Sequence, residues 1–340
     1  MCSQVLPEGE VAQLAASMLE SLPSSTRDIP AQLTQAKLTA IHNLVTSRLF
    51  QHEEARNVLL TVCCKHLCIH LAHRDELRLC ADILGEIISF LYKQRQEQER
   101  SHGKVNNCLH HDVKILLPIL DKLIRTVLII IDRTTPVLGS LVACMIGLLQ
   151  LLDEFHYRRM WEELADRKPT KDFLSRVFLV FRDLVKQEVF PSDWLVIKMV
   201  CNQVMIASLQ EFAQPLIFMF LDTSRHYCFD LQLWNQYFNL AVAFLTQPTL
   251  QLEKFSEVKR EKIMEKYGDM RVLMGFQILS MWSNLGENKM HFIPSMVGPF
   301  LEVTLVPETE LRKATLNIFF DMMECEQKAN GNFKQVSLAS

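Results

Sequence analysis

The residues most capable of chemistry lie together in residues 63–73, which read CCKHLCIHLAH. Thiolates and imidazoles are the ligands that zinc prefers, and on a helix His66 and His70 would share one face at i, i+4 spacing. Cys63 and His73 would continue that face. One straight helix cannot surround a tetrahedral ion, so a second element would have to supply ligands. The pair at positions 110 and 111, both histidines, would do so only through a chance of packing.

The alternative interpretation of this segment is structural. Cys64 and Cys68 would then be core residues, and the histidines would lie in a groove between two helices. The spacing lacks the loop geometry of structural zinc sites, so we favour this alternative. We therefore predict no metal-binding residue in the chain.

Two sequence-adjacent pairs combine a thiol with an imidazole, Cys63 with His66 and Cys228 with His226. Adjacency alone supplies neither a positioned base nor an oxyanion hole, both of which nucleophilic catalysis needs. The polar run of Asp153, Glu154 and His156 is typical of a helix end, where such groups cap the backbone and carry solvated charge.

Glycine spacing excludes the common nucleotide and hydrolase motifs. The ten glycines are scattered, and no two lie closer than seven residues apart. A P-loop needs glycines five apart, a dinucleotide fingerprint needs them two and three apart, and a nucleophile elbow needs them four apart. We therefore expect no catalytic residue, no cofactor-binding residue and no cofactor, and we predict that the chain is not an enzyme.

The elements that carry these residues are predicted to be helices. Glycine is scarce, the 12 prolines lie between apolar segments, and apolar residues recur at three-to-four spacing. No strand-length alternation is evident. The helices are predicted over 8–21, 30–48, 52–72, 74–99, 108–132, 136–154, 171–188, 193–211, 212–222, 230–246, 256–285, 290–303 and 308–327.

Paired helices with short loops predict an all-α fold, an armadillo or HEAT-like helical-repeat solenoid. An irregular helical bundle is the alternative, because no clean repeat period is visible. We predict N-terminal repeats over 1–100, an exposed linker over 101–107, C-terminal repeats over 108–327 and a disordered tail over 328–340.

Composition narrows the class of protein further. The net charge of −3 lacks the basic excess of a nucleic-acid-binding face. Ten scattered cysteines without a signal peptide indicate reduced thiols in the cytoplasm. The uncharged run over 134–152 has the length of a membrane span, but its charged neighbours favour a helix buried within the repeats.

Aromatic residues and charge runs have similarly plain interpretations. Rings next to leucines at helical spacing usually belong to the core, and mixed charges at helical spacing usually mark a solvated face. The rings are Trp194, Trp234, Tyr237, Phe238 and Trp282, and the charges are Lys259, Arg260, Glu261, Lys262, Glu265 and Lys266.

Several longer motifs carry a family resemblance when they are taken in combination. They are PSDW (191–194), LQLWNQYFNLAVAFLTQPTLQLE (231–253), KYGDMR (266–271), MWSNLGE (281–287), HFIPSMVGPFLEVTL (291–305), ETELRKA (308–314) and FFDMM (319–323). From about residue 171 to residue 335 the chain resembles the dedicator-of-cytokinesis (DOCK) family of Rac guanine-nucleotide exchange factors. Residues 48–60, RLFQHEEARNVLL, resemble it more loosely. The wording SMW, NLGE and HFIP is most similar to the branch that holds the third and fourth members.

The resemblance implies a helical, armadillo-like scaffold that lies between an N-terminal membrane-binding domain and a C-terminal exchange domain. It therefore implies a chain truncated before the exchange domain, without nucleotide-ejecting residues of its own. It also implies cytoplasmic residence, ELMO-type adaptors and the parent exchange factor as partners, and only an indirect connection to Rac-type GTPases.

Two functions remain open at this point. The chain is either a non-catalytic scaffold segment of a DOCK-type exchange factor in Rac signalling, or an independent helical-repeat adaptor with other partners. In both cases we expect protein partners, no nucleic acid and no direct membrane span.

Overall fold

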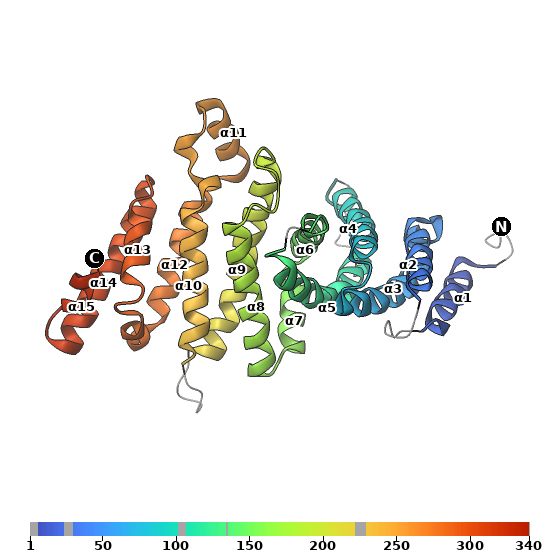
Figure 1. Ribbon diagram of the computed structural model, residues 1–340, viewed down its shortest axis with the longest axis horizontal. Helices are drawn as coiled ribbons and strands as arrows, with labels where there is room; N and C mark the ends of the chain where they lie inside the picture. The colour runs from blue at the N-terminus through green and yellow to red at the C-terminus, as the bar shows by residue number, and fades with distance from the viewer. Residues whose placement is uncertain (1–5, 24–29, 101–106, 134, 222–228, 340) are drawn as a thin grey trace. The chain divides into compact units, whose positions relative to one another are not determined.

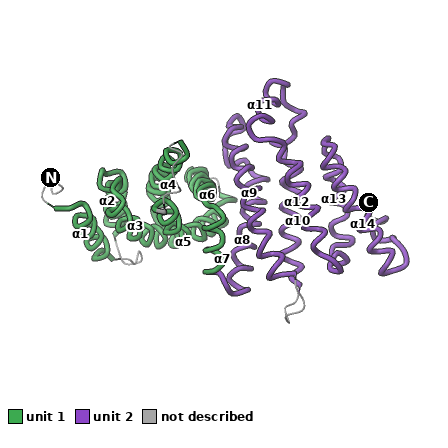
Figure 2. Tube along the Cα trace, turned by 180° about the vertical axis from the view of Figure 1, so that it is seen from behind, with its two compact units in different colours: residues 1–163 green, residues 164–340 purple. Residues whose placement is uncertain are grey.

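The computed structural model describes residues 6–23, 30–100, 107–133, 135–221 and 229–339, and these residues form helices and turns without a strand (Figure 1). The chain divides into two compact units, Met1–Glu163 and Leu164–Ser340 (Figure 2). The prediction of an all-α helical-repeat solenoid is confirmed. The predicted linker over 101–107 falls largely outside the described residues, and the division between the units lies instead after Glu163.

In the first unit the helices alternate between two layers. The unit holds α1 (Glu8–Ser21), α2 (Ala31–Thr46), the short 3-10 helix η2 (Arg48–Gln51), α3 (Glu53–His73), α4 (Leu77–Arg100), α5 (Asn107–Ile130), α6 (Leu138–Leu151) and α7 (Glu154–Glu163). The helix α3 packs on α1 and α5, while α4 packs on α2 and α6. Each helix thus packs against the second helix along the chain, which is the contact pattern of stacked helical pairs.

The second unit repeats this alternation. It holds α8 (Arg167–Lys186), α9 (Leu195–Phe220), α10 (Leu231–Thr246), η3 (Pro248–Leu250), η4 (Leu252–Lys254), α11 (Glu257–Tyr267), α12 (Met270–Asn284), η5 (Gly286–Phe292), α13 (Val297–Thr304), α14 (Thr309–Asn330) and α15 (Lys334–Ala339). The helix α10 packs on α8 and α13, while α12 packs on α9 and α14. The helix α11 leaves both layers and lies beyond the ends of α10 and α12 (Figure 1).

Aromatic side chains fill the core of the second unit. The Phe238 ring is fully buried and lies 5.3 Å from the Phe292 ring and 5.7 Å from the Phe300 ring, both in edge-to-face geometry. Trp234 and Trp282 pack against the same ring at 5.9 and 6.2 Å. These contacts join α10, α12, η5 and α13, so the large apolar area of the rings holds both layers together.

Two of the predicted helix boundaries were wrong for local reasons. The segments 193–211 and 212–222 form one helix, α9, which contains Pro215 in its interior. The segment 256–285 forms two helices, because Gly268 ends α11 with a φ of +67°. Glycine reaches this left-handed region without the steric cost that a side chain would bring.

The helix α7 was not predicted, and α6 ends three residues earlier than expected. Of the ten residues of α7, only His156, Tyr157 and Met160 are buried. A helix with so few core contacts carries little apolar periodicity, so its sequence resembles a polar loop.

The prediction of a disordered tail over 328–340 was also wrong. The helix α14 continues to Asn330, and α15 follows it. The carboxylate of Glu326, which is fully buried, accepts hydrogen bonds from the backbone amides of Gln335 at 2.8 Å and Val336 at 2.9 Å. A distant carboxylate therefore satisfies the free amides at the start of α15.

The uncharged run over 134–152 falls mostly within α6, whose residues are largely buried. Among the described residues, no single helix is long and apolar enough to cross a membrane. The pair α6 and α7 meets the length and hydropathy criteria only when the two helices are taken together across a bend of 106°.

Candidate functional site

The histidines of the CCKHLCIHLAH segment lie in the core on α3. His66 and His70 are each 1% exposed, and none of their four ring nitrogens has a hydrogen-bond partner among the described residues. Burial, reinforced by the nearby ammonium of Lys37, lowers the pKa of His66 to about 4 and also lowers the pKa of His70. Both rings are therefore neutral at physiological pH, which makes their burial tolerable.

The cysteines of the same segment are likewise packed inside. Cys63 and Cys64 are buried and Cys68 is half-buried, in agreement with the structural interpretation. Burial raises the pKa of Cys63 to about 12 and the pKa of Cys68 to about 11. Thiols with such pKa values hold almost no thiolate at neutral pH, so this segment has no activated nucleophile. The other sequence-adjacent pair, Cys228 and His226, lies outside the described residues.

A different set of side chains converges where α5, α6 and α7 meet. The ligand atoms of His110, Asp153 and His156 all lie within 4.8 Å of one another. Asp153 Oδ1 accepts from the backbone amide of His156 at 3.2 Å, so the predicted capping role of this aspartate is present as well. His110 and Asp153 lie on separate predicted helices, and no local pattern in the sequence links the two residues.

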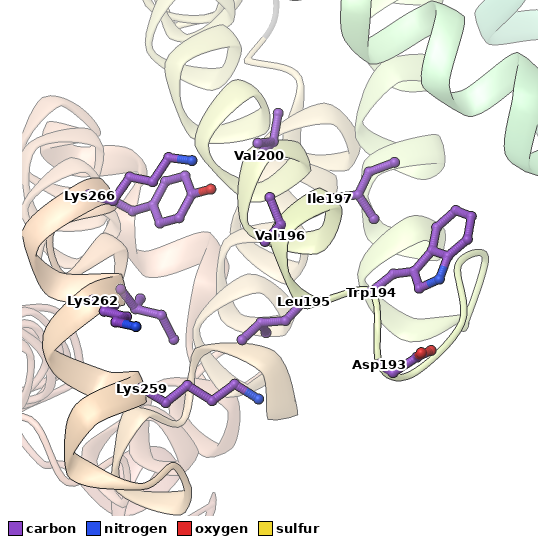
Figure 3. Close-up of a pocket in the computed structure, with 11 residues that line it drawn as sticks. Asp193, Trp194, Leu195, Val196, Ile197, Val200, Lys259, Lys262 and Lys266 are labelled. Atoms are coloured by element: carbon purple, nitrogen blue, oxygen red, sulfur yellow. The ribbon is translucent and has the colours of Figure 1, made fainter.

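An accessible groove lies within the second unit, between the start of α9 and α11. Its volume is about 710 Å³, which is within the range of ordinary ligand and peptide pockets. Figure 3 shows Lys259, Lys262 and Lys266 extending from α11 on one side, with Val196 and Val200 on α9. We call this feature the α9–α11 groove.

Apolar exposure marks the α9 side of the groove. Trp194, which precedes the first residue of α9, is 53% exposed, and Val196 is 65% exposed. The interpretation of Trp194 as a core residue was therefore wrong, although Trp234, Tyr237, Phe238 and Trp282 are buried as predicted. An exposed tryptophan beside an exposed valine is typical of a protein-binding surface.

Positive charge marks the α11 side. Lys259, Lys262 and Lys266 follow one another at spacings of three and four, so they share one face of the helix. None of the three forms an ion pair within the part of the chain that the structure describes, and Asp193 is the one acidic residue that lines the groove. The groove therefore combines an apolar floor with a basic rim.

Part of the α9–α11 groove could be predicted from the sequence. The lysines at positions 259, 262 and 266 are visible at helical spacing, but they were interpreted only as part of a solvated face. The exposure of Trp194 could not be predicted, because a tryptophan next to leucine and valine at a helix start gives the same sequence pattern whether it points inward or outward.

A family model and the sequences of related proteins both match nearly the whole chain. Residues 2–339 match the family model described as the dedicator of cytokinesis (DOCK) TPR region. The chain is 38% identical over 347 residues to dedicator of cytokinesis protein 3 of Mus musculus, and 40% identical over 338 residues to dedicator of cytokinesis protein 4 of Homo sapiens. These alignments cover 98% and 96% of this chain, respectively, and in both cases 16% of the relative.

Proposed function

Because this chain belongs to the dedicator-of-cytokinesis family, we propose that it acts as a non-catalytic helical scaffold in Rac-type small-GTPase signalling. The identity to proteins 3 and 4 supports the branch that the SMW, NLGE and HFIP motifs indicate. The family match is to a helical repeat region, and helical repeats offer long surfaces for protein partners rather than enclosed reaction sites. Nucleotide exchange would then belong to another part of the family's architecture.

The cellular setting follows from the same premise. We place the chain in the cytoplasm, with ELMO-type adaptors and the parent exchange factor as its partners and with Rac-type GTPases reached indirectly. Eight free cysteines among the described residues suit a reducing compartment.

The α9–α11 groove is the single observation that supports partner binding most directly. Its exposed Trp194 and Val196 would bury apolar area against a partner, and its three lysines would attract negative charge. An amphipathic helix with acidic flanks fits both features, because such a helix lays its apolar face into a groove while its acidic residues meet the rim. We therefore propose an acidic, amphipathic helical segment of an ELMO-type adaptor as the occupant.

A charge-reversal pair tests this proposal. Lys262→Glu reverses one charge on the rim, whereas Arg260→Glu reverses an exposed charge of the same helix that does not line the groove. In a binding titration with an ELMO-type adaptor, Lys262→Glu is expected to weaken binding by roughly tenfold, about 1.4 kcal/mol. Arg260→Glu is expected to change it less than about twofold. Equal effects of both substitutions, or no binding by the unsubstituted chain, would contradict the proposed surface.

The non-catalytic assignment has its own test. The release of GDP from Rac is measured with and without the purified chain, whose helical content is verified by circular dichroism. We expect no acceleration, because the assignment puts exchange outside this region. A clear acceleration would show that an exchange surface lies within these 340 residues.

A further inference from the structure

We propose that His110, Asp153 and His156 form a binding site for a divalent first-row transition metal of the Zn²⁺ type. His110 lies in the first turns of α5, Asp153 lies between α6 and α7, and His156 lies in the first turn of α7. Two imidazoles and one carboxylate make up the three-ligand set that zinc sites with an open fourth position use.

Both ring nitrogens of His156 have polar neighbours. Its Nε2 lies 3.0 Å from the backbone oxygen of His110, and its Nδ1 lies 2.6 Å from Asp153 Oδ1. The backbone amide of Asp153 also donates to Nδ1 at 3.3 Å. If Nε2 donates its one N–H to the carbonyl oxygen, the lone pair on Nδ1 faces both this amide and the carboxylate oxygen, and a metal ion between Nδ1 and the carboxylate would remove their repulsion.

This hydrogen bond is the arrangement that metal-bound histidines commonly show. A histidine ligand usually donates its second ring N–H to a carboxylate or a backbone carbonyl, which fixes the tautomer and the direction of the ring. The His156 side chain is 2% exposed, so its ring is held in this orientation by the core.

His110 contributes an independent observation. Its Nδ1 lies 3.1 Å from Asp153 Oδ2, and this buried nitrogen has no hydrogen-bond partner among the described residues. An unsatisfied buried nitrogen is costly, and a metal bond would satisfy it. The two imidazoles also lie nearly parallel, with planes 15° apart and centroids 5.2 Å apart.

Metal binding would require the imidazole nitrogens and the Asp153 carboxylate to move slightly apart. Tetrahedral ligands with bonds of about 2.0–2.1 Å lie roughly 3.3 Å apart, slightly more than the 2.6 and 3.1 Å seen between the nitrogens and the carboxylate. The Asp153 side chain is 39% exposed, so a rotation of its carboxylate can open these distances at the expense of the hydrogen bond from the backbone amide of His156. A cavity of about 220 Å³ adjoins the three residues and leaves room for a water molecule as the fourth ligand.

The charges around the cavity are close to balanced. Arg95 also lines it, and its guanidinium opposes a cation, but it pairs with Glu99 at 3.3 Å and donates to the backbone oxygen of Gln150 at 2.9 Å. The carboxylate of Asp153 remains as the local negative charge. A bound metal would tie the start of α5 to the junction of α6 and α7, so metal binding and the stability of the first unit would be linked.

The test uses the full chain after treatment with a chelator, with Zn²⁺ as the ligand in calorimetry and Co²⁺ as the spectroscopic probe. We expect one ion per chain, a raised melting temperature with Zn²⁺, and a Co²⁺ spectrum without the sulfur-to-metal charge-transfer band of a thiolate site. His110→Ala removes a partly exposed ligand, and Asp153→Asn removes the charge while keeping the shape. Each is expected to weaken Zn²⁺ binding by at least about 100-fold, because the loss of a group that only orients a ligand already costs about 10–100-fold.

His111→Ala is the matched control, because His111 is the neighbouring histidine, is exposed, and lies outside the cluster. It should leave Zn²⁺ affinity unchanged. Absence of stoichiometric binding would overturn the proposal. Equal loss in His111→Ala, or a thiolate band in the Co²⁺ spectrum, would overturn it as well.

Discussion

The ion pair between Arg56 on α3 and Asp112 on α5 provides a sharp test of the energetics of the first unit. Arg56 Nε lies 2.7 Å from Asp112 Oδ2, and the two side chains are 7% and 2% exposed. The guanidinium also donates to the backbone oxygen of Gln51 at 3.2 Å. The perturbations are Asp112→Ala, Arg56→Met and the double substitution Arg56→Met with Asp112→Leu.

The magnitude follows from the burial of both charges. At an effective dielectric constant of about 20, two charges about 4 Å apart attract each other by roughly 4 kcal/mol. Removing the charges from water costs several kcal/mol each, so the net contribution of the intact pair is near zero. Removing one partner leaves a buried, uncompensated charge, and Asp112→Ala is therefore expected to cost about 3–5 kcal/mol.

The double substitution should be much milder than either single one. It replaces both charges with apolar groups of similar volume, and such replacements are often neutral. We expect it to lose less than about 1.5 kcal/mol, well below the loss in Asp112→Ala.

The pH dependence should distinguish the two single substitutions. Burial raises the pKa of Asp112 from 3.8, and Arg56 offsets part of this rise. Without Arg56 the pKa rises further, so the folded state binds more protons than the unfolded state. The stability of Arg56→Met should therefore fall as the pH rises above 3.8 and recover towards acidic pH. Asp112→Ala leaves an arginine that cannot lose its proton, so its deficit should persist across the same range.

Urea denaturation followed by far-ultraviolet circular dichroism and by tryptophan fluorescence measures these changes. Trp161 is the one tryptophan of the first unit, so a variant retaining only Trp161 reports that unit separately. The reasoning would be refuted by a loss below about 1 kcal/mol in Asp112→Ala, or by a double substitution that costs at least as much as Asp112→Ala.

Three further changes test other parts of the molecule. Gly275→Ala should lower the free energy of unfolding in urea by about 1 kcal/mol, because an added Cβ would lie 2.7 Å from Leu311 Cδ1. Gly85→Ala is the control: no atom lies within 4 Å of its added Cβ, so the better helix propensity of alanine should raise the free energy of unfolding by about 0.5–1 kcal/mol. His66→Leu should reduce the loss of stability between pH 6.5 and about 4, since the unfolded state there binds the proton that the folded state rejects; an unchanged slope of stability against pH would contradict this. Four thiols whose pKa burial raises to about 12 should resist maleimide in the native protein and react in urea, as read by peptide mass spectrometry; they are Cys63, Cys80, Cys144 and Cys201.

The fold class was predictable because helical periodicity is local. Seams such as Leu60, Cys64, Leu67 and Leu71 repeat the three-to-four spacing that a helix needs to bury one face, and these four residues are buried on α3. The boundaries depended on tertiary contacts instead. The start of α15 depends on Glu326, about ten residues earlier, and no local pattern announces that contact.

The candidate sites were less predictable than the fold. His110 lies more than forty residues before Asp153 in the sequence, and only the packing of α5 beside α6 and α7 brings the two together. By contrast, His66 and His70 had the more suggestive spacing, but no further ligand converges on them among the described residues. The types and spacing of candidate ligands within one helix therefore did not predict where ligand atoms from different helices come together.

The weak anchoring of α11 has a consequence for how the α9–α11 groove behaves over time. Ile263 is the one buried residue of α11, whereas α9 buries side chains along most of its length. Local opening needs little free energy where few apolar contacts hold an element, so the amides of α11 should exchange with deuterium long before those of α9. The α9 side of the groove is therefore stably folded, whereas the α11 side opens locally. A bound partner should be detectable because it would slow the exchange of the α11 amides.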